Sequence, residues 1–249
     1  ADLSNSDKTD GFLKETTSFV PGDFSGAFFQ AGVAELTMAC CCIGMALHGG
    51  VIAACGTFFV FSDYMKPAVR MAALMELPVK FIWTHDAFRV GEDGPTHEPV
   101  EQEAQIRLME KLKNHHGKNS VLVLRPADSV ETTQCWKMAM ENTETPTALI
   151  LSRQNIAQLP EGNEYAEAEK GAYIVAGSDE NPDVILVASG SEVATLEAGA
   201  KLLRADGVRI RIVSCPSEGL FRSQSKEYQE SVLPTGAKTF GLTAGLPVN

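Results

Sequence analysis

The 249-residue sequence is poor in positive charge. Lysine and arginine number 21 together, aspartate and glutamate number 32, and the formal net charge at pH 7 is −11. Nucleic-acid binding depends largely on basic side chains that neutralise phosphates, so this composition argues against a nucleic-acid partner. Apolar residues make up 44% of the chain and charged residues 21%, which is the balance of a folded globular protein.

The six cysteines include no C-x-x-C pair. Cys40, Cys41 and Cys42 are consecutive within an apolar segment, and adjacent cysteines on one helix make a poor disulfide framework. We therefore expect reduced core cysteines in a cytoplasmic protein. The first residues also lack the basic-then-apolar pattern of a signal peptide.

No Asp, Glu, Lys or Arg occurs from Leu36 to Ser62, which raises the question of a membrane span. His48-Gly49-Gly50 and Gly56 interrupt this run, whereas a spanning helix needs about 20 predominantly apolar residues. Two shorter buried elements explain the run better, and we expect no membrane segment.

The first 160 residues alternate between predicted strands and helices. Strands are expected at residues 51–55, 79–84, 121–124 and 147–151, and helices at 35–47, 58–75, 100–114 and 129–141. The first of these helices is apolar on nearly all sides, so we expect it to be buried. The β-α-β order is typical of a parallel sheet with helices on both faces.

A turn-rich acidic stretch at residues 160–170 resembles a linker, and a second α/β pattern follows it. Strands are expected at 184–188, 208–213 and 238–242, with a helix at 191–203. We predict an α/β fold in two domains, at residues 1–168 and 169–249. Because no helix follows the last strand, we expect a fragment that is truncated at both ends.

Polar residues follow three of the predicted strands. His85 and Asp86 follow one, Arg125 another and Arg153 a third. Ligands bind at the carboxyl ends of parallel strands, so a histidine and an arginine on one rim would suit a phosphate or carboxylate. Structural ion pairs of the two arginines explain the pattern about equally well.

The loop at residues 85–97 carries two histidines and three acids. Long irregular loops inside compact domains are often functional. A metal site is one interpretation, although the spacing matches no standard metal motif. A solvated acidic loop is the other, and the glycines and proline of the loop favour a fixed shape and a site.

Glu35 begins a predicted helix that has no other acid or base, between Ala34 and Leu36. Burying a carboxylate is costly, although the helix N-terminus offsets part of that cost. A buried glutamate would suit proton exchange with a nitrogen base, and a glutamate exposed at the helix end is the alternative.

Three aromatic residues recur at every third position, namely Phe58, Phe61 and Tyr64. This spacing places them on one side of a helix. Such a row usually packs in a core, and it also suits an aromatic wall against a flat heterocycle.

Several motifs, in this order, resemble the transketolase family over nearly the whole chain. They are Ala1-Asp2-Leu3 with Ser6, Ala46-Leu47-His48-Gly49-Gly50, Phe61-Ser62-Asp63-Tyr64, Thr84-His85-Asp86, Gly91-Glu92-Asp93-Gly94-Pro95-Thr96-His97, Arg125-Pro126-Ala127-Asp128, Leu151-Ser152-Arg153-Gln154-Asn155 and Ala188-Ser189-Gly190-Ser191-Glu192-Val193. The family often has Arg before the helix-starting glutamate and His or Phe after it, where this chain has Ala34 and Leu36. A basic segment at residues 111–118 is an addition, which we interpret as a surface insertion.

The resemblance implies a thiamine diphosphate enzyme of the pentose phosphate pathway. Such an enzyme moves a two-carbon ketol unit from a ketose phosphate to an aldose phosphate, as a homodimer with its active site between subunits. The family's first domain binds the diphosphate and Mg²⁺ or Ca²⁺, and its motif is missing here. The chain is thus expected to hold the pyrimidine-binding domain and part of the C-terminal domain, to supply no metal ligand and to be inactive alone.

The resemblance also assigns roles to individual residues. Glu35 would bond the aminopyrimidine nitrogen and promote the imino form that removes the thiazolium proton, and His97 would act close to the reacting carbons. The cofactor-binding positions are Asp2, Glu35, Phe58, Phe61 and Tyr64, and the substrate-binding positions are Ser6, His85, Asp93, His97 and Arg153. Other thiamine diphosphate enzymes, such as a deoxyxylulose-phosphate synthase or a dehydrogenase β subunit, and a metal-binding α/β module stay open as alternatives.

Overall fold

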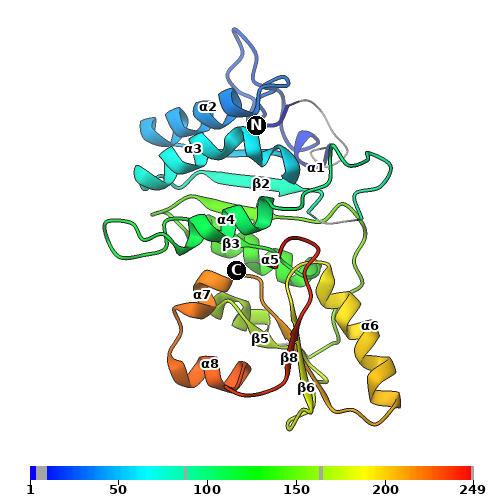
Figure 1. Cartoon of the computed structure of the whole chain (residues 1–249). Coiled ribbons are helices and arrows are strands. Elements are labelled where there is room, and N and C mark those ends of the chain that lie inside the picture. Colours follow the sequence, from blue (N-terminus) through cyan, green and yellow to red (C-terminus); the bar gives the residue numbers. More distant parts are fainter. Residues whose placement is uncertain (4–9, 87–88, 163–164, 248–249) are drawn as a thin grey trace.

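The computed structural model describes residues 1–3, 10–86, 89–162 and 165–247, which form two α/β units (Figure 1). The elements of the first unit are α1 (Asp10–Leu13), α2 (Glu35–His48), β1 (Ala54–Phe58), the 3₁₀ turn η1 (Phe59–Phe61), α3 (Ser62–Leu74), β2 (Lys80–Thr84), α4 (Gln102–Lys111), β3 (Leu122–Leu124), α5 (Ser129–Glu141) and β4 (Thr147–Ile150). The 3₁₀ helix η2 (Tyr165–Lys170) connects the two units, and the elements of the second unit are β5 (Tyr173–Ile174), β6 (Val184–Ala188), α6 (Glu192–Ala205), β7 (Ile210–Ser214), α7 (Glu218–Arg222), α8 (Lys226–Val232) and β8 (Thr239–Gly241).

The first sheet has the strand order β1-β2-β4-β3, and all of its neighbouring strands are parallel. Phe58 at the end of β1 pairs with Thr84 at the end of β2, and Trp83 pairs with Ile150 at the end of β4. The carboxyl ends of these strands therefore lie at one edge, and the residues that follow them project from the same rim.

Helices cover both faces of this sheet, as the alternating sequence pattern predicts. One apolar core joins the sheet to α2, α3 and α4 through side chains such as Met38, Val69 and Ile106. A second joins the opposite face to α5 through Cys135 and Ala139. In Figure 1, α2 and α3 lie above the sheet and the second unit lies below it. The predicted fold class is therefore confirmed.

The second sheet has the order β5-β7-β6-β8. Strands β6, β7 and β8 run parallel to their neighbours, and the two-residue β5 pairs antiparallel with β7. The three parallel strands and α6 match the expected pattern, with shifts of a few residues at their ends. Strand β5 and helices α7 and α8 are not predicted from the sequence, because elements of two to seven residues carry little periodicity.

Two predicted elements at the start of the first sheet are misplaced. The strand expected at 51–55 is β1 at Ala54–Phe58, and the helix expected from residue 58 begins at Ser62 after η1. In β1, buried and half-buried side chains alternate, so the strand follows a period of two that the continuous apolar run concealed. Among the described residues, no helix is long and apolar enough to cross a membrane.

Helix α2 is not buried all round, contrary to expectation. Its buried face comprises Glu35, Met38, Ala39, Cys42 and Ile43. The opposite face exposes Leu36, Cys40, Met45 and Leu47. The lack of charge in this helix therefore reflects an exposed apolar face in addition to a core. Cys40 is not a core residue, although all six cysteines are free, as expected.

The acidic stretch at residues 160–170 does more than link the two units. Its second half forms η2, which packs against α5, and Ala168 is fully buried there. The Tyr165 hydroxyl donates to Oδ2 of Asp128 at 2.7 Å, and Lys137 forms an ion pair with Glu169. These contacts attach the connection to the first unit.

Candidate active site

An aromatic cluster occupies the carboxyl ends of β1 and β2. The Phe58 ring stacks on the His85 ring with centroids 3.5 Å apart. Phe61 lies 6.3 Å from Phe58 and meets the edge of the His97 ring at 5.2 Å. His97 is also 6.2 Å from Phe58. Four predicted site residues from three separate segments therefore converge at the rim where a parallel sheet binds ligands.

The three aromatic residues lie on three consecutive elements rather than on one helix. Phe58 ends β1, Phe61 ends η1 and Tyr64 is in the first turn of α3. The Tyr64 ring stacks 6.2 Å from Phe61 and is 61% exposed. Phe59, by contrast, is fully buried against Trp83. Phe59 thus does the core packing, and the other three line a surface.

A threonine precedes and positions each histidine of the cluster. The Thr84 hydroxyl lies 2.9 Å from Nδ1 of His85, and the Thr96 hydroxyl lies 2.9 Å from Nδ1 of His97. His85 is 4% exposed and has a φ of 62°, a left-handed conformation that costs a non-glycine residue energy and that is enriched at functional sites. The repeated Thr-His dipeptide was the available sequence signal for these supporting residues.

Arg125 belongs to a buried ion network and not to the rim. Its guanidinium donates to Asp86 from Nε at 3.0 Å and to both carboxylate oxygens of Glu192 at 2.7 and 2.9 Å. Its side chain is 1% exposed. Burial raises the pKa of Asp86, and the charge of Arg125 opposes that shift. The structural interpretation is therefore correct for Arg125, whose network joins β2 to α6 of the second unit.

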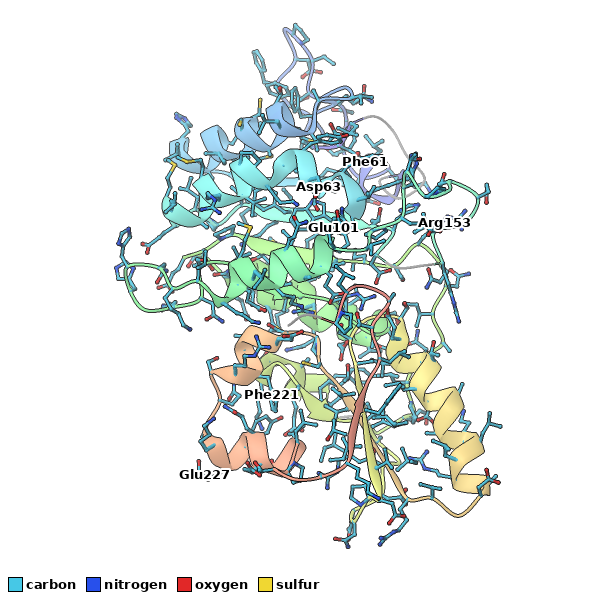
Figure 2. All side chains as sticks on the ribbon, viewed as in Figure 1. Phe61, Asp63, Glu101, Arg153, Phe221 and Glu227 are labelled. Carbon is cyan, nitrogen blue, oxygen red and sulfur yellow. The ribbon has the colours of Figure 1, made fainter. Side chains whose placement is uncertain are left out.

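Arg153 stays available at the rim. It is exposed, and within the described part of the chain it forms no ion pair. Its guanidinium lies over Gly91, where an added Cβ would be 3.2 Å from Cζ. Figure 2 shows Arg153 and Phe61 in the same unit. Asp93, two residues after Gly91, is exposed and likewise has no described partner.

Glu35 is 9% exposed at the first position of α2. Helix α2 packs against β1 and α3, the two elements that flank η1. No described residue forms a hydrogen bond or ion pair with its carboxylate. A buried carboxylate without a partner is costly, and the position at a helix N-terminus reduces that cost. Of the two interpretations of Glu35, the buried one is observed.

The N-terminal residues lie beside β1. Asp2 forms isolated bridges with Gln30 and Gly56, and its Oδ1 accepts from the Leu3 amide at 2.6 Å. Asp2 is thus next to the strand that leads to Phe58. Ser6, the remaining predicted substrate residue, lies outside the described residues.

Two further observations concern the surroundings. No group of three or more His, Cys, Asp or Glu side chains suited to a metal ion occurs within the described ranges.

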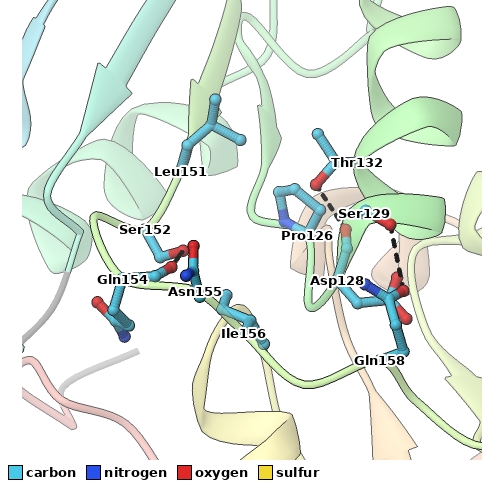
Figure 3. Close-up of a pocket in the computed structure, with 10 residues that line it drawn as sticks. All are labelled: Pro126, Asp128, Ser129, Thr132, Leu151, Ser152, Gln154, Asn155, Ile156 and Gln158. Atoms are coloured by element: carbon cyan, nitrogen blue, oxygen red, sulfur yellow. Dashed lines mark hydrogen bonds between the residues drawn. The ribbon is translucent and has the colours of Figure 1, made fainter. Parts of the chain in front are cut away.

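A cavity of about 430 Å³ opens at the start of α5 (Figure 3). There the Thr132 hydroxyl donates to the Asp128 carbonyl and the Ser129 hydroxyl donates to Gln158. None of the predicted site residues lines this cavity.

Comparison with protein-family models identifies both units. The model of the transketolase pyrimidine-binding domain matches residues 1–158, and that of the transketolase-like C-terminal domain matches residues 171–249. The chain belongs to the transketolase family. Its aromatic cluster, with His85 and His97, lies in the part that matches the pyrimidine-binding domain.

Individual transketolases are similar over nearly the whole chain. The transketolase of Bacillus subtilis is 48% identical over 242 residues, which cover 96% of this chain and 34% of the relative. That of Streptococcus pyogenes is 46% identical over 248 residues, 98% of this chain and 32% of the relative. The chain therefore spans about a third of the length of the curated relatives it matches.

Solved structures show the same relationship. A Pichia stipitis transketolase mutant, described as a complex with xylulose 5-phosphate, superposes with a TM-score of 0.87 at 37% identity and covers 100% of this chain and 36% of its own. A structure described as a split-gene transketolase, an inactive β4 tetramer, gives a TM-score of 0.70 at 28% identity. It covers 96% of this chain and 71% of its own.

Proposed function

We propose that this chain is the part of a transketolase that holds the cofactor's pyrimidine ring and part of the sugar phosphate. The longer protein would transfer a two-carbon ketol unit from a ketose phosphate to an aldose phosphate. The observation that carries the proposal is the convergence of Phe58, Phe61, His85 and His97 at the carboxyl ends of β1 and β2.

Thiamine diphosphate fits the side chains at this rim. The partly exposed faces of Phe58, Phe61 and Tyr64 suit a flat heterocycle. The buried Glu35 carboxylate has no described partner and would be satisfied by a ring nitrogen. When bound, the cofactor supplies an electron sink for cleavage of the carbon–carbon bond. As the family resemblance implies, the Mg²⁺ or Ca²⁺ site of the longer protein would lie in another domain.

The remaining residues would bind and orient the substrate. Arg153, a planar cation at the rim, suits a sugar phosphate, and His85, which follows the neighbouring strand β2, would contribute a second donor. The Asp93 carboxylate, which has no partner among the described residues, would accept from a sugar hydroxyl. His97, held by Thr96, would donate or accept a proton near the reacting carbons. Asp2 is the remaining residue proposed to bind the cofactor, and Ser6 is the remaining residue proposed to bind the substrate.

We further propose that the longer protein is a homodimer of the cytoplasm. The exposed apolar residues of α2 and the turn after it support a partner surface, since Leu36, Leu47, Val51 and Ile52 are 44–62% exposed. Six free cysteines are in keeping with a reducing compartment. We propose a domain boundary between Ala168 and Glu169, which falls between the two family matches.

Product analysis tests the reaction. The protein that contains this chain should convert xylulose 5-phosphate and ribose 5-phosphate into a longer ketose phosphate and a shorter aldose phosphate. Release of carbon dioxide from pyruvate without ketol transfer would instead assign it to the synthase or dehydrogenase alternative. The isolated chain should show no transfer, because we assign the diphosphate and metal site to another domain of the longer protein, and efficient transfer by the isolated chain would contradict the proposal.

Glu35→Gln tests the residue that is assigned the proton exchange. The amide keeps the shape but cannot exchange that proton, so kcat should fall by about 10²–10⁴-fold with the thermal midpoint almost unchanged. Glu227→Gln is the matched control, because Glu227 is an exposed first-turn glutamate of α8. Equal kcat values for the two variants would remove Glu35 from the mechanism.

A further inference from the structure

A second cavity, of about 480 Å³, lies between the two units. Its floor comes from residues that follow the parallel strands of the second sheet, including Ser189 after β6, Cys215 after β7 and Thr243 after β8. Its walls come from α4 of the first unit and α7 of the second. Figure 2 shows Phe221 on α7 in the lower unit. None of the residues proposed for the active site lines this cavity.

The topology of the second sheet favours a ligand at this place. The chain passes from β6 to β7 on one side and later returns to β8 on the other side of β6. In open parallel sheets, ligands bind in the crevice outside the carboxyl ends of the strands at such a reversal. Ser189 and Thr243 lie at the ends of the two strands that flank it.

Arg107 of α4 gives the cavity unsatisfied donors. Its side chain is 1% exposed, yet Nε and Nη1 have no hydrogen-bond acceptor within the described part of the chain. The third nitrogen, Nη2, donates to Oε1 of Glu103 at 3.3 Å. Glu218, at 3.8 Å from Nε, and Glu110, at 3.7 Å from Nη1, lie beyond hydrogen-bond distance. Leaving buried donors without acceptors is costly, so an acceptor that entered the cavity would be stabilised.

The charges of the wall select against an anion. Glu103 and Glu218 offset Arg107 and Arg222 at the cavity surface, and the buried Glu110 behind Arg107 adds negative charge. A phosphate would therefore gain little electrostatic stabilisation from these side chains. A hydroxyl group, by contrast, accepts from a guanidinium and donates to a carboxylate at once.

Apolar residues complete the cavity. Phe221, half-buried, presents its ring with Ala104, Val187, Leu242 and Leu246 around it. Carbon faces of a sugar or a flat base pack well on such a wall. The volume lies within the usual range for pockets that bind small molecules.

We propose that this cavity binds an uncharged, hydroxyl-rich small molecule of the size of a pentose or nucleoside, with Arg107 and Glu218 as its polar contacts. The site is separate from the proposed sugar-phosphate site. Because it joins α4 to the second unit, an occupant would stabilise the docking of the two units.

Isothermal titration of the chain with D-ribose, adenosine and ribose 5-phosphate tests the proposal. It also distinguishes a pentose from a nucleoside as the occupant. One of the two uncharged probes should bind at a single site with a dissociation constant below about 10 mM, and ribose 5-phosphate should not compete for that site. Failure of both uncharged probes to bind at that concentration would overturn the proposal.

Two variants locate the binding. Arg107→Lys and Glu218→Gln should each weaken it by about tenfold, which corresponds to the loss of one hydrogen bond to a charged group. Glu218 is 30% exposed, so its variant stays informative if the Arg107 variant does not fold. Arg153→Gln is the control and should leave the affinity unchanged. Unchanged binding by the folded cavity variants, or loss of binding with Arg153→Gln, would disprove the site, whatever the outcome for ketol transfer.

Discussion

Gly91 determines where the guanidinium of Arg153 can lie. The residue has a φ of 104°, and a Cβ there would come within 3.2 Å of Arg153 Cζ. An alanine would therefore strain the turn and require the guanidinium to shift by a few tenths of an ångström. We propose that this approach of backbone and guanidinium helps to orient Arg153 for the phosphate contact.

Gly91→Ala should accordingly raise the KM for sugar phosphates in the protein that contains this chain by about tenfold, with a smaller effect on kcat. Gly94→Ala is a matched control, since Gly94 has a φ of 79° and nothing within 4 Å of its added Cβ. Steady-state kinetics of both variants will show whether the effect needs Arg153. Equal KM values for the two variants would show that the rise in KM comes from backbone strain alone.

Glu131 is a buried acid that joins the two units. Its Oε1 accepts from the Tyr173 and Ser214 hydroxyls at 2.8 Å each, and its Oε2 accepts from the Ala127 amide. Burial raises its pKa from 4.5 to about 7. The folded chain therefore holds a proton that the unfolded chain releases between about pH 4.5 and 7.

This linkage gives a pH-dependent stability. The contribution of Glu131 is fully present below about pH 4.5 and is lost as the pH rises through 7, a change on the order of a few kcal/mol. Thermal midpoints from pH 5 to 8 should fall less steeply in Glu131→Gln than in the wild type. Glu141→Gln, an exposed change on the same helix, should keep the wild-type slope. Parallel slopes for Glu131→Gln and the wild type would rule out this titration.

At the scale of elements, the two faces of helix α2 have different roles. Its buried face anchors the sheet and places Glu35, and its other face leaves Leu36 and Leu47 in solvent. A helix with no charge over 13 of its 14 residues is not adapted to a solvent-facing position. The proposed dimer contact explains why the exposed half is apolar.

Leu47→Glu should lower the dimer fraction, because a carboxylate would be desolvated in an apolar interface. Sedimentation velocity of the chain at several concentrations measures this fraction. Leu202→Glu is the control, since Leu202 is 72% exposed on α6. A chain that is monomeric throughout, or a dimer that both variants leave intact, would exclude α2 as the contact.

At the scale of the whole molecule, Arg125 connects the two units. It binds Asp86 of the first unit and Glu192 of the second, and Nη1 also donates to the Ser189 carbonyl and hydroxyl at 3.1 Å. Removal of this guanidinium would leave two buried carboxylates without their cation. Such a loss typically costs 3–5 kcal/mol.

Arg125→Met should therefore uncouple the units. We expect calorimetry to resolve two transitions where the wild type shows one, with faster proteolysis between residues 155 and 162. Arg209→Met removes an exposed pair with Asp183 and should have little effect. A single unshifted transition for Arg125→Met would show that η2 and the apolar contacts hold the units together without it.

The sequence by itself determined the fold class and most of the elements. Apolar residues recur with a characteristic period within each strand and each helix, and this period can be recognised in a short stretch of sequence. The parallel sheet and its covering helices were therefore predictable. The same holds for the residues after each strand, because strand ends are visible in the sequence. His85 and Arg153 were candidates for this reason, whereas His97 was a candidate from the loop at residues 85–97 and from the family resemblance.

Only the tertiary structure decided which candidates meet. Arg125 directly follows β3 and Arg153 lies three residues after β4, yet Arg125 is paired by Glu192, 67 residues away, and Arg153 stays exposed. Likewise, Phe59 and Phe61 are two residues apart, but one fills the core and the other lines the rim. Burial and pairing depend on contacts between segments far apart in the chain, and no local pattern encodes those contacts.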